Sequence, residues 1–300
     1  MPHTTVPAAA PTLPDTLRLG AVHLTVTHLD RSVDWYATAL GLRVHRHDLD
    51  SAELGDGTTT VLVLQEDTQA QPPGRHAGLY HYALLYSRRE ELARAALRLG
   101  QTRTAIQGAS DHGTHEAIYL PDPDGNGIEL AADRPRDQWP TPEEEFSGGG
   151  PRALDFSALL SSVAGEAPPA HVAPGLRMGH VHLHVGSIAD GLGFYRDVLG
   201  LQVWGRLPSA AFVSAGGYHH HLGFNVWRGE GVGPAPDRTV GLRHWTIELQ
   251  TAAEVAEVRA RVQRAGIPVT DDATGFMVRD PWDIAVRFLV GGPLDGTVAS

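Results

Sequence analysis

Residues 176–203 read LRMGHVHLHVGSIADGLGFYRDVLGLQV, and this stretch decides the fold because it occurs twice in the chain. Residues 17–44 read LRLGAVHLTVTHLDRSVDWYATALGLRV, with identical residues at many aligned positions. Self-similarity of this kind is the signature of repeated structural units. The copies differ at a position that can bind a metal, because His180 stands where the earlier copy has Ala21.

Each copy has the pattern of a strand, a helix and further strands. Residues 21–26 alternate as a strand does, and residues 31–40 carry apolar side chains at helical spacing before Gly41. Two other units match each other, since the motif Gly-Leu-x-His begins at residue 78 and again at residue 241. The sequence therefore predicts an α+β fold of four βαβββ modules. Their ranges are 17–66, 78–133, 176–228 and 241–290.

The four modules fall into two groups separated by a segment of different composition. Residues 134–175 contain PRDQWPTPEEEF, SGGGP and EAPPAHVAP, and they are too many for an ordinary connection within a domain. We predict that they link an N-terminal domain, residues 17–133, to a C-terminal domain, residues 176–290. Residues 1–16 are rich in proline and alanine and are predicted to form a disordered tail.

The composition limits the class of protein. Acidic residues outnumber basic ones by 35 to 24, giving a net charge of −11, which argues against a nucleic-acid or anionic-membrane partner. No apolar run is long enough to cross a membrane, and the N-terminus lacks the features of a secretory signal, so a cytoplasmic location is expected. The chain has no cysteine but 17 histidines, so its metal ligands would be imidazoles and carboxylates rather than thiolates.

Three motifs point to a known family. The segments DPDGNGIEL at 122–130, GHVHLHV at 179–185 and YHHHLGFNVW at 218–227 resemble the vicinal oxygen chelate superfamily and, within it, the two-domain bacterial catechol 2,3-dioxygenase branch. The resemblance implies that the modules pair into two open, barrel-like domains that can hold a divalent metal. It implies an iron(II)-dependent extradiol dioxygenase that cleaves a catechol, a small aromatic diol, with O₂. Manganese(II), zinc or nickel are the alternative metals, and a homodimer is compatible with the resemblance.

The resemblance also implies which positions bind the metal: first-strand histidines from two modules and a last-strand glutamate, a set that suits iron(II). The first-strand positions of modules one to four hold Ala21, His81, His180 and His244. The last-strand position holds Glu129 in module two but Arg287 in module four. Neither the pair of modules one and two nor the pair of modules three and four therefore supplies a full set, whereas modules two and three together supply His81, Glu129 and His180. We predict a metal site of these three residues in a barrel of modules two and three, formed within one chain or across a dimer.

Two more residues match catalytic positions of the family. His220, in the segment HHHLGF of module three, is expected to act as an acid–base catalyst, since an imidazole titrates near neutral pH. Tyr119 lies ten residues before Glu129 and is expected to donate a hydrogen bond to the substrate. Five further histidines are candidates for lining the substrate cavity: His112, His115, His244, His23 and His182. For His23 and His182 packing within the barrel is the favoured interpretation, and His23 is also a candidate to replace the missing ligand of module one.

Two other functions compete with ring cleavage. One is a glyoxalase-type isomerase or lyase that uses zinc or nickel with a glutamate base. Such an enzyme usually takes a fourth protein ligand from the last strand of an A-type module, where this chain has Val63 and Gly223, which cannot bind a metal. The other is a non-catalytic resistance protein that sequesters a small molecule on the same fold. The changed ligand positions in modules one and four keep this function open.

Overall fold

The computed structural model describes residues 12–147 and 150–292. Residues 1–11 of the predicted tail lie outside this range, while Leu13 is 3% exposed and its backbone N–H donates to the carbonyl of Gly200. Within the described residues, no helix is long and apolar enough to cross a membrane.

All four predicted modules have the order strand, helix, three strands. Module one contains β2 (Val22–Val26), α1 (Leu29–Trp35) with the π-helix η1 (Tyr36–Leu40), β3 (Arg43–His47), β4 (Ser51–Gly55) and β5 (Thr60–Glu66), after the short β1 (Arg18–Leu19). Module two contains β6 (Gly78–Tyr86), α2 (Arg89–Thr102), β7 (Gly108–Asp111), β8 (His115–Pro121) and β9 (Gly127–Asp133).

The second half of the chain repeats this order. Module three contains β11 (Arg177–His184), α5 (Ile188–Leu192) with the π-helix η3 (Gly193–Val198), β12 (Gln202–Leu207), β13 (Ala210–Ser214) and β14 (Leu222–Asn225). Module four contains β15 (Gly241–Leu249), α6 (Ala252–Arg264), β16 (Val269–Asp271), β17 (Gly275–Arg279) and β18 (Ala285–Val290). The α+β prediction with four βαβββ modules is confirmed.

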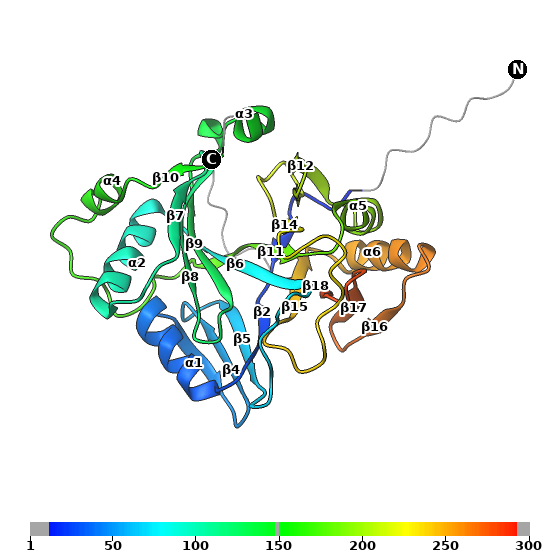
Figure 1. Ribbon diagram of the computed structural model, residues 1–300, viewed down its shortest axis with the longest axis horizontal. Helices are drawn as coiled ribbons and strands as arrows, with labels where there is room; N and C mark the ends of the chain where they lie inside the picture. The colour runs from blue at the N-terminus through cyan, green and yellow to red at the C-terminus, as the bar shows by residue number, and fades with distance from the viewer. Residues whose placement is uncertain (1–11, 148–149, 293–300) are drawn as a thin grey trace, which may run out of the picture.

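Strand pairing decides which modules share a barrel. Within every module the first strand runs parallel to the last, as β6 does to β9 and β11 to β14. Between modules, first strands pair antiparallel: β6 with β11, and β2 with β15 (Figure 1). Modules two and three therefore form one barrel, called here barrel 2/3, and modules one and four form the other, barrel 1/4. Both barrels join strands from the two halves of the chain, so the predicted division at residues 134–175 stays a prediction.

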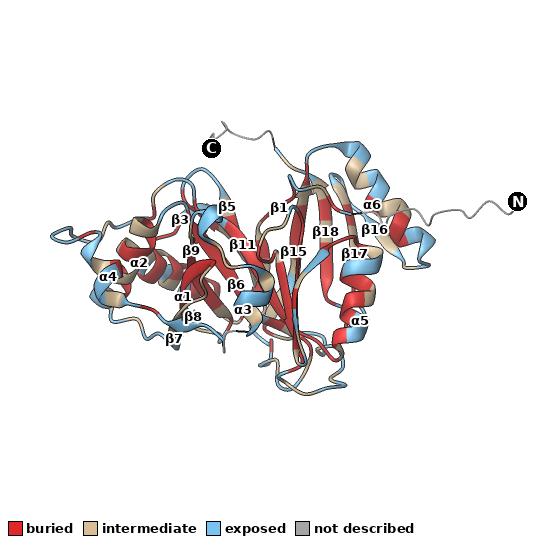
Figure 2. Ribbon diagram, turned by 90° about the horizontal axis from the view of Figure 1, so that it is seen from above, coloured by how far each residue is buried: buried red, intermediate tan, exposed pale blue. Residues whose placement is uncertain are grey.

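Buried tyrosines couple the two modules within each half of the chain. Tyr36 of module one donates to the Asp122 carboxylate of module two at 2.9 Å, and Tyr82 donates to the Tyr36 hydroxyl at 3.0 Å. In the second half, Tyr195 donates to Asp280 at 2.7 Å. Burial raises the pKa of Asp280 to about 6. Helices α1 and α2 lie on one side of the molecule and α5 and α6 on the other, while the buried residues concentrate in the strands between them (Figures 1 and 2).

The segment between the halves packs along barrel 2/3. It contains η2 (Arg136–Gln138), α3 (Pro142–Ser147), β10 (Arg152–Ala153) and α4 (Phe156–Ser161). Strand β10 pairs with β7 of module two, while the ring of Phe146 packs on Phe212 of module three at a centroid distance of 5.2 Å. The segment thereby contacts both modules of the barrel that it connects.

Candidate metal centre

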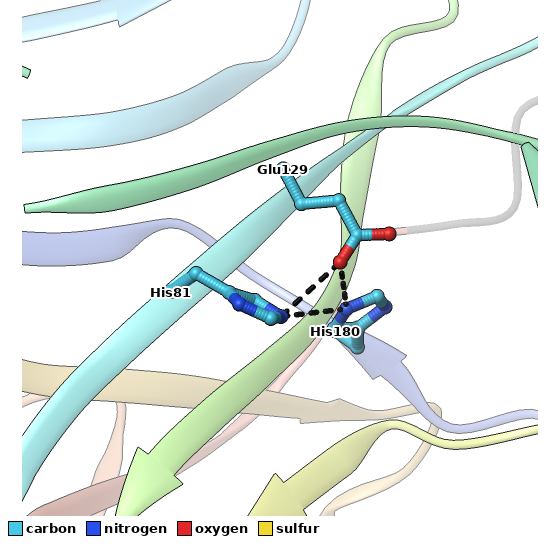
Figure 3. Close-up of side chains that lie close together, drawn as sticks. All are labelled: His81, Glu129 and His180. Atoms are coloured by element: carbon cyan, nitrogen blue, oxygen red, sulfur yellow. Dashed lines mark hydrogen bonds and ion pairs between the residues drawn. The ribbon is translucent and has the colours of Figure 1, made fainter. Parts of the chain in front are cut away.

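Three neighbouring strands bring the predicted ligands together. Strand β6 lies between β9 and β11, and in the register of both pairs Ala83 stands opposite Glu129 on one side and His180 on the other. His81 precedes Ala83 by two residues, so its side chain leaves β6 on the same face. The side chains of His81, Glu129 and His180 consequently converge on one point inside barrel 2/3 (Figure 3).

The convergence is close and buried. The Glu129 Oε2 atom lies 3.0 Å from His180 Nε2 and 3.1 Å from His81 Nε2, and the two Nε2 atoms are 3.4 Å apart. The exposed fractions are 7% for His81 and 1% for each of the other two residues. Ligands at right angles about a metal, with bonds of about 2.1 Å, lie about 3 Å from each other. Two imidazoles and one carboxylate at these distances fit one face of an octahedral metal such as iron(II).

Glu129 is ionised, so it can supply a negative charge to a bound cation. Burial opposes ionisation of this carboxyl group, but His180 and the hydrogen bonds from His115 and His180 outweigh it and hold the pKa of Glu129 well below its usual value. Burial lowers the pKa of His180, which leaves that imidazole neutral. An ionised carboxylate beside a neutral imidazole is the protonation state in which Glu129 and His180 can both bind a metal.

His115 orients the other carboxylate oxygen of Glu129. Its Nε2 lies 3.0 Å from Glu129 Oε1, and its Nδ1 lies 2.9 Å from the hydroxyl of Thr114. Burial alone would lower the pKa of His115, yet the hydrogen bond to Glu129 outweighs it and the pKa is raised. A hydrogen bond to His115 thus holds Oε1 of Glu129, while Oε2 faces His81 and His180.

Tyr119 lies beside the three ligands. It stands opposite Glu129 in the β8–β9 pair, and its ring centroid is 5.7 Å from that of His81. Its hydroxyl is 2.7 Å from His112 Nε2, and the His112 ring stacks on His115 at 4.4 Å. Burial raises the pKa of Tyr119 well above its usual value, so the phenol keeps its proton and can donate it in a hydrogen bond. Tyr119, predicted to bond to the substrate, therefore lies together with His112 and His115, which were predicted to line the substrate cavity.

His220 approaches the ligands from module three. It belongs to the loop between β13 and β14, and its ring centroid is 4.1 Å from that of His180. Its Nδ1 lies 2.9 Å from Nδ1 of His219. The predicted acid–base residue is thus in contact with a predicted ligand.

His182 packs beside His81 in barrel 2/3. Its ring is 5.0 Å from that of His81, and its Nε2 accepts from the Asn225 amide at 2.9 Å. Tyr80 packs edge-on against His182 at 5.1 Å and against Trp227 at 5.3 Å. Tyr80 is 39% and Trp227 51% exposed, so this aromatic group extends from the buried His182 to the protein surface.

The structure separates His23 and His244 from the other candidates. They pair in register between β2 and β15 of barrel 1/4, where their rings stack at 3.9 Å. Arg287, at the position of Glu129, forms a two-point ion pair with Asp272. Because both histidines belong to the other pair of first strands, they do not join the group of His81, Glu129 and His180.

Three neighbours of the site were not anticipated from the sequence: Asp133, Tyr80 and Asn225. Asp133 bonds to His219 at 3.2 Å and accepts from Tyr218 at 2.9 Å. It follows Glu129 by four residues on β9, and an even spacing places both side chains on one face of the strand. That spacing is a signal from which Asp133 could have been found.

Comparison with known proteins agrees with this architecture. The model of the Glyoxalase/Bleomycin resistance protein/Dioxygenase superfamily matches residues 18–130 and 177–288. A Bacillus subtilis (strain 168) protein named catechol-2,3-dioxygenase is 40% identical over 268 residues, which cover 88% of this chain and 93% of that protein.

Solved structures share the fold at low identity. A Bacillus subtilis (strain 168) protein provisionally described as a dioxygenase has a TM-score of 0.60 and 15% identity, covering 92% of this chain and 86% of that one. Glyoxalase I from Zea mays has a TM-score of 0.56 and 16% identity, covering 92% of both chains.

Proposed function

The chain belongs to the Glyoxalase/Bleomycin resistance protein/Dioxygenase superfamily, and on that premise we propose that it is an extradiol dioxygenase that cleaves catechol or a substituted catechol with O₂. The observation that carries the proposal is the convergence of His81, Glu129 and His180 on one buried point, in a chain 40% identical to a catechol-2,3-dioxygenase. A set of two histidines and one carboxylate leaves further coordination positions for a substrate and O₂.

We propose iron(II) as the metal, held by His81 and His180 through Nε2 and by Glu129 through Oε2. When bound, iron(II) supplies the one-electron chemistry that lets a catecholate react with O₂. Two neutral imidazoles and one carboxylate leave part of the metal's charge uncompensated, which favours an anionic catecholate. Manganese(II), zinc and nickel remain alternatives, because nitrogen and oxygen ligands accept each of them.

The surrounding side chains have separate proposed roles. His220 accepts the proton that a catechol hydroxyl loses and returns it during ring opening. Tyr119, held by His112, donates a hydrogen bond to an oxygen of the substrate. His115 keeps Glu129 in orientation, as partners of metal ligands commonly do. His182, which packs against Tyr80, contacts the substrate ring.

The direct test is ring cleavage by the iron-loaded protein. Protein prepared anaerobically with iron(II) is mixed with catechol and O₂, and the yellow ring-fission product is followed by absorbance. We expect product with at least one catechol of a substituted panel, and none from Glu129→Ala. If the wild-type protein contains iron yet yields no product with any of them, the isomerase or binding-protein alternative is favoured.

Location and assembly also remain proposals. The proposed enzyme acts on small molecules in the cytoplasm, without a nucleic-acid or membrane partner. Barrel 2/3 is complete within one chain in the structure, so a homodimer is not needed to assemble the ligands. Light scattering of the purified protein measures whether it is a dimer.

A further inference from the structure

A hydrogen-bond chain, buried at His219 and His220 and partly exposed at Asp133, connects module two to the proposed catalytic base. Asp133, the last residue of β9, extends toward the loop that precedes β14. Its Oδ1 lies 3.2 Å from His219 Nε2, and its Oδ2 accepts from the Tyr218 hydroxyl at 2.9 Å. His219 Nδ1 in turn lies 2.9 Å from His220 Nδ1. The chain therefore runs from a carboxylate through one imidazole to the next.

Counting protons along this chain fixes the state of each ring. A carboxylate only accepts hydrogen bonds, so the Asp133 contact requires a proton on His219 Nε2. His219 is 1% exposed and its ring stacks on His115 at 4.6 Å, so burial favours the neutral form with a single N–H. Its Nδ1 is then a lone pair and can only accept. The proton between the two Nδ1 atoms must accordingly belong to His220.

We propose that Asp133 and His219 are positioning residues that fix His220 with its proton on Nδ1 and a free lone pair on Nε2. Among the residues that the structure describes, no hydrogen-bond partner is found for His220 Nε2. The inference rests on the proposed function for its purpose. In that reaction the O–H bond of a catechol hydroxyl breaks and an N–H bond forms at Nε2. The resulting positive charge is stabilised through His219 by the Asp133 carboxylate.

The hydrogen-bond chain from Asp133 to His220 depends on the pairing of modules two and three. Asp133 comes from module two, whereas His219 and His220 come from module three. The strand pairing that assembles the ligands therefore also sets the tautomer of the base. Burial works against ionisation of Asp133, but the hydrogen bond from His219 outweighs it and lowers the pKa of this carboxyl group, as an acceptor role requires.

The substitution Asp133→Asn keeps the shape of the side chain but would reverse the direction of the hydrogen bonds from residue 133 through His219 to His220. An asparagine amide can donate to His219 Nε2, which would move the His219 proton to Nδ1 and the His220 proton to Nε2. We expect kcat to fall on the order of 10- to 100-fold, with KM and iron content within about twofold of wild type. Glu145→Gln is the matched control, since it makes the same change in a carboxylate of the linker helix α3 that bonds to Trp204. That variant should keep kcat within about twofold.

A purely structural role predicts a different order among variants. If Asp133 only anchors the loop, the isosteric asparagine should restore both stability and activity that Asp133→Ala loses. If Asp133 positions the proton, Asp133→Asn should keep the melting temperature but remain as slow as Asp133→Ala. Recovery of wild-type kcat by the asparagine variant would overturn the proposal.

The tautomer can be measured without any activity. In metal-free protein labelled with ¹⁵N-histidine, long-range ¹H–¹⁵N correlations distinguish a proton on Nδ1 from one on Nε2, and a His220→Gln variant identifies the signal. We expect Nδ1–H for wild-type His220 and Nε2–H in Asp133→Asn. A wild-type signal from Nε2–H would overturn the inference even if ring cleavage were observed. Conversely, the expected tautomers without ring cleavage would contradict only the proposed function.

Discussion

At the scale of the residue, Glu129 is the side chain of the site on which metal binding should depend most. It is 1% exposed and ionised, with one oxygen held by His115 and the other facing two imidazoles. A buried carboxylate of this kind needs a compensating positive charge, because burial without one is costly. A bound cation compensates for it without changing the neighbours, so metal binding should depend strongly on this residue.

We expect Glu129→Ala to weaken iron(II) binding at least about 100-fold, since loss of a ligand exceeds the effect of losing a ligand's hydrogen-bond partner. Glu129→Gln keeps the volume but loses the charge, and should fall between the alanine variant and wild type. Equilibrium dialysis with metal analysis measures both, and Glu145→Gln should bind as wild type does. Full iron occupancy in Glu129→Ala would remove this residue from the site.

Tyr119 gives a second test at this scale. Burial keeps its phenol protonated, and His112 fixes the hydroxyl at 2.7 Å. We expect Tyr119→Phe to reduce kcat about tenfold while iron content stays unchanged, because one hydrogen bond to the substrate is lost. Steady-state kinetics and metal analysis on the same samples check both parts. An unchanged kcat would mean that the hydroxyl does not contact the reacting substrate.

Some of the site could be predicted from the sequence. The family resemblance implies which strand positions bind a metal, and the residue types at those positions were sufficient to select His81, Glu129 and His180 as a set that comes together. Asp133 could have been added from its even spacing to Glu129. The contact of His115 with Glu129 depends on the side-chain rotamers of two strands, and a sequence pattern does not specify these.

At the scale of the element, β6 is the strand on which the site depends. It pairs with β9 and β11, and so holds both neighbours that carry ligands. Gly127 allows the close approach of β9, because a Cβ there would lie 2.1 Å from the Tyr80 carbonyl oxygen and 3.0 Å from the Cβ of His81. A larger residue would push Glu129 away from His81.

Gly127→Ala should therefore lower the free energy of unfolding by about 1–3 kcal/mol and weaken iron binding as well. Gly108→Ala is the matched control, since Gly108 lies on β7 of the same module and an added Cβ meets nothing within 4 Å. Urea unfolding and metal titration of the two variants make the comparison. Equal behaviour of both variants would show that β6 and β9 can separate without cost.

The helices show where periodicity stops being informative. Residues 31–40 are predicted as one helix, and the structure has α1 followed by the π-helix η1 up to Leu40. Gly41 ends it with φ of 73°, as its position in the sequence indicates. Apolar spacing locates the helix and its end, but the change to a π-helix depends on packing and on the hydrogen bond from Gly41 N–H to the Tyr36 carbonyl.

At the scale of the whole molecule, buried histidines link stability to pH. Burial is the largest cause that lowers the pKa of six of them, to about 3 or 4: His23, His112, His184, His219, His221 and His244. Their unfolded value is about 6.5, so below that pH the unfolded chain binds more protons than the folded one. The stability they contribute is complete above pH 6.5 and is lost as the pH falls toward 3.

We expect the free energy of unfolding of metal-free protein to be nearly constant from pH 7 to 8. It should then fall steeply below pH 6.5, each histidine adding up to about 1.4 kcal/mol per pH unit. Urea unfolding at a series of pH values measures the slope. A double variant, His23→Gln with His244→Gln, should have a shallower slope while leaving barrel 2/3 unchanged. A slope identical to that of wild type would show that folding does not lower the pKa of these two rings.

The arrangement of the modules shows both the reach and the limit of the sequence. The repeats establish four units. The ligand sets of units one and two, and of units three and four, are incomplete, which indicates that the second unit pairs with the third. The partnership of modules one and four follows only from the pairing of β2 with β15. No sequence motif indicated that pairing, because Ala21 and Arg287 occupy positions at which a histidine and a glutamate would have indicated a metal site.

The central claim is that a single metal binds between modules two and three, and one measurement tests it most directly. Crystals of the iron-loaded protein are measured on both sides of the iron absorption edge, and an anomalous difference map locates the metal. The account predicts one strong peak about 2.0–2.2 Å from His81 Nε2, His180 Nε2 and Glu129 Oε2. A peak between His23 and His244, or among residues 219–221 with none at those three atoms, would contradict it.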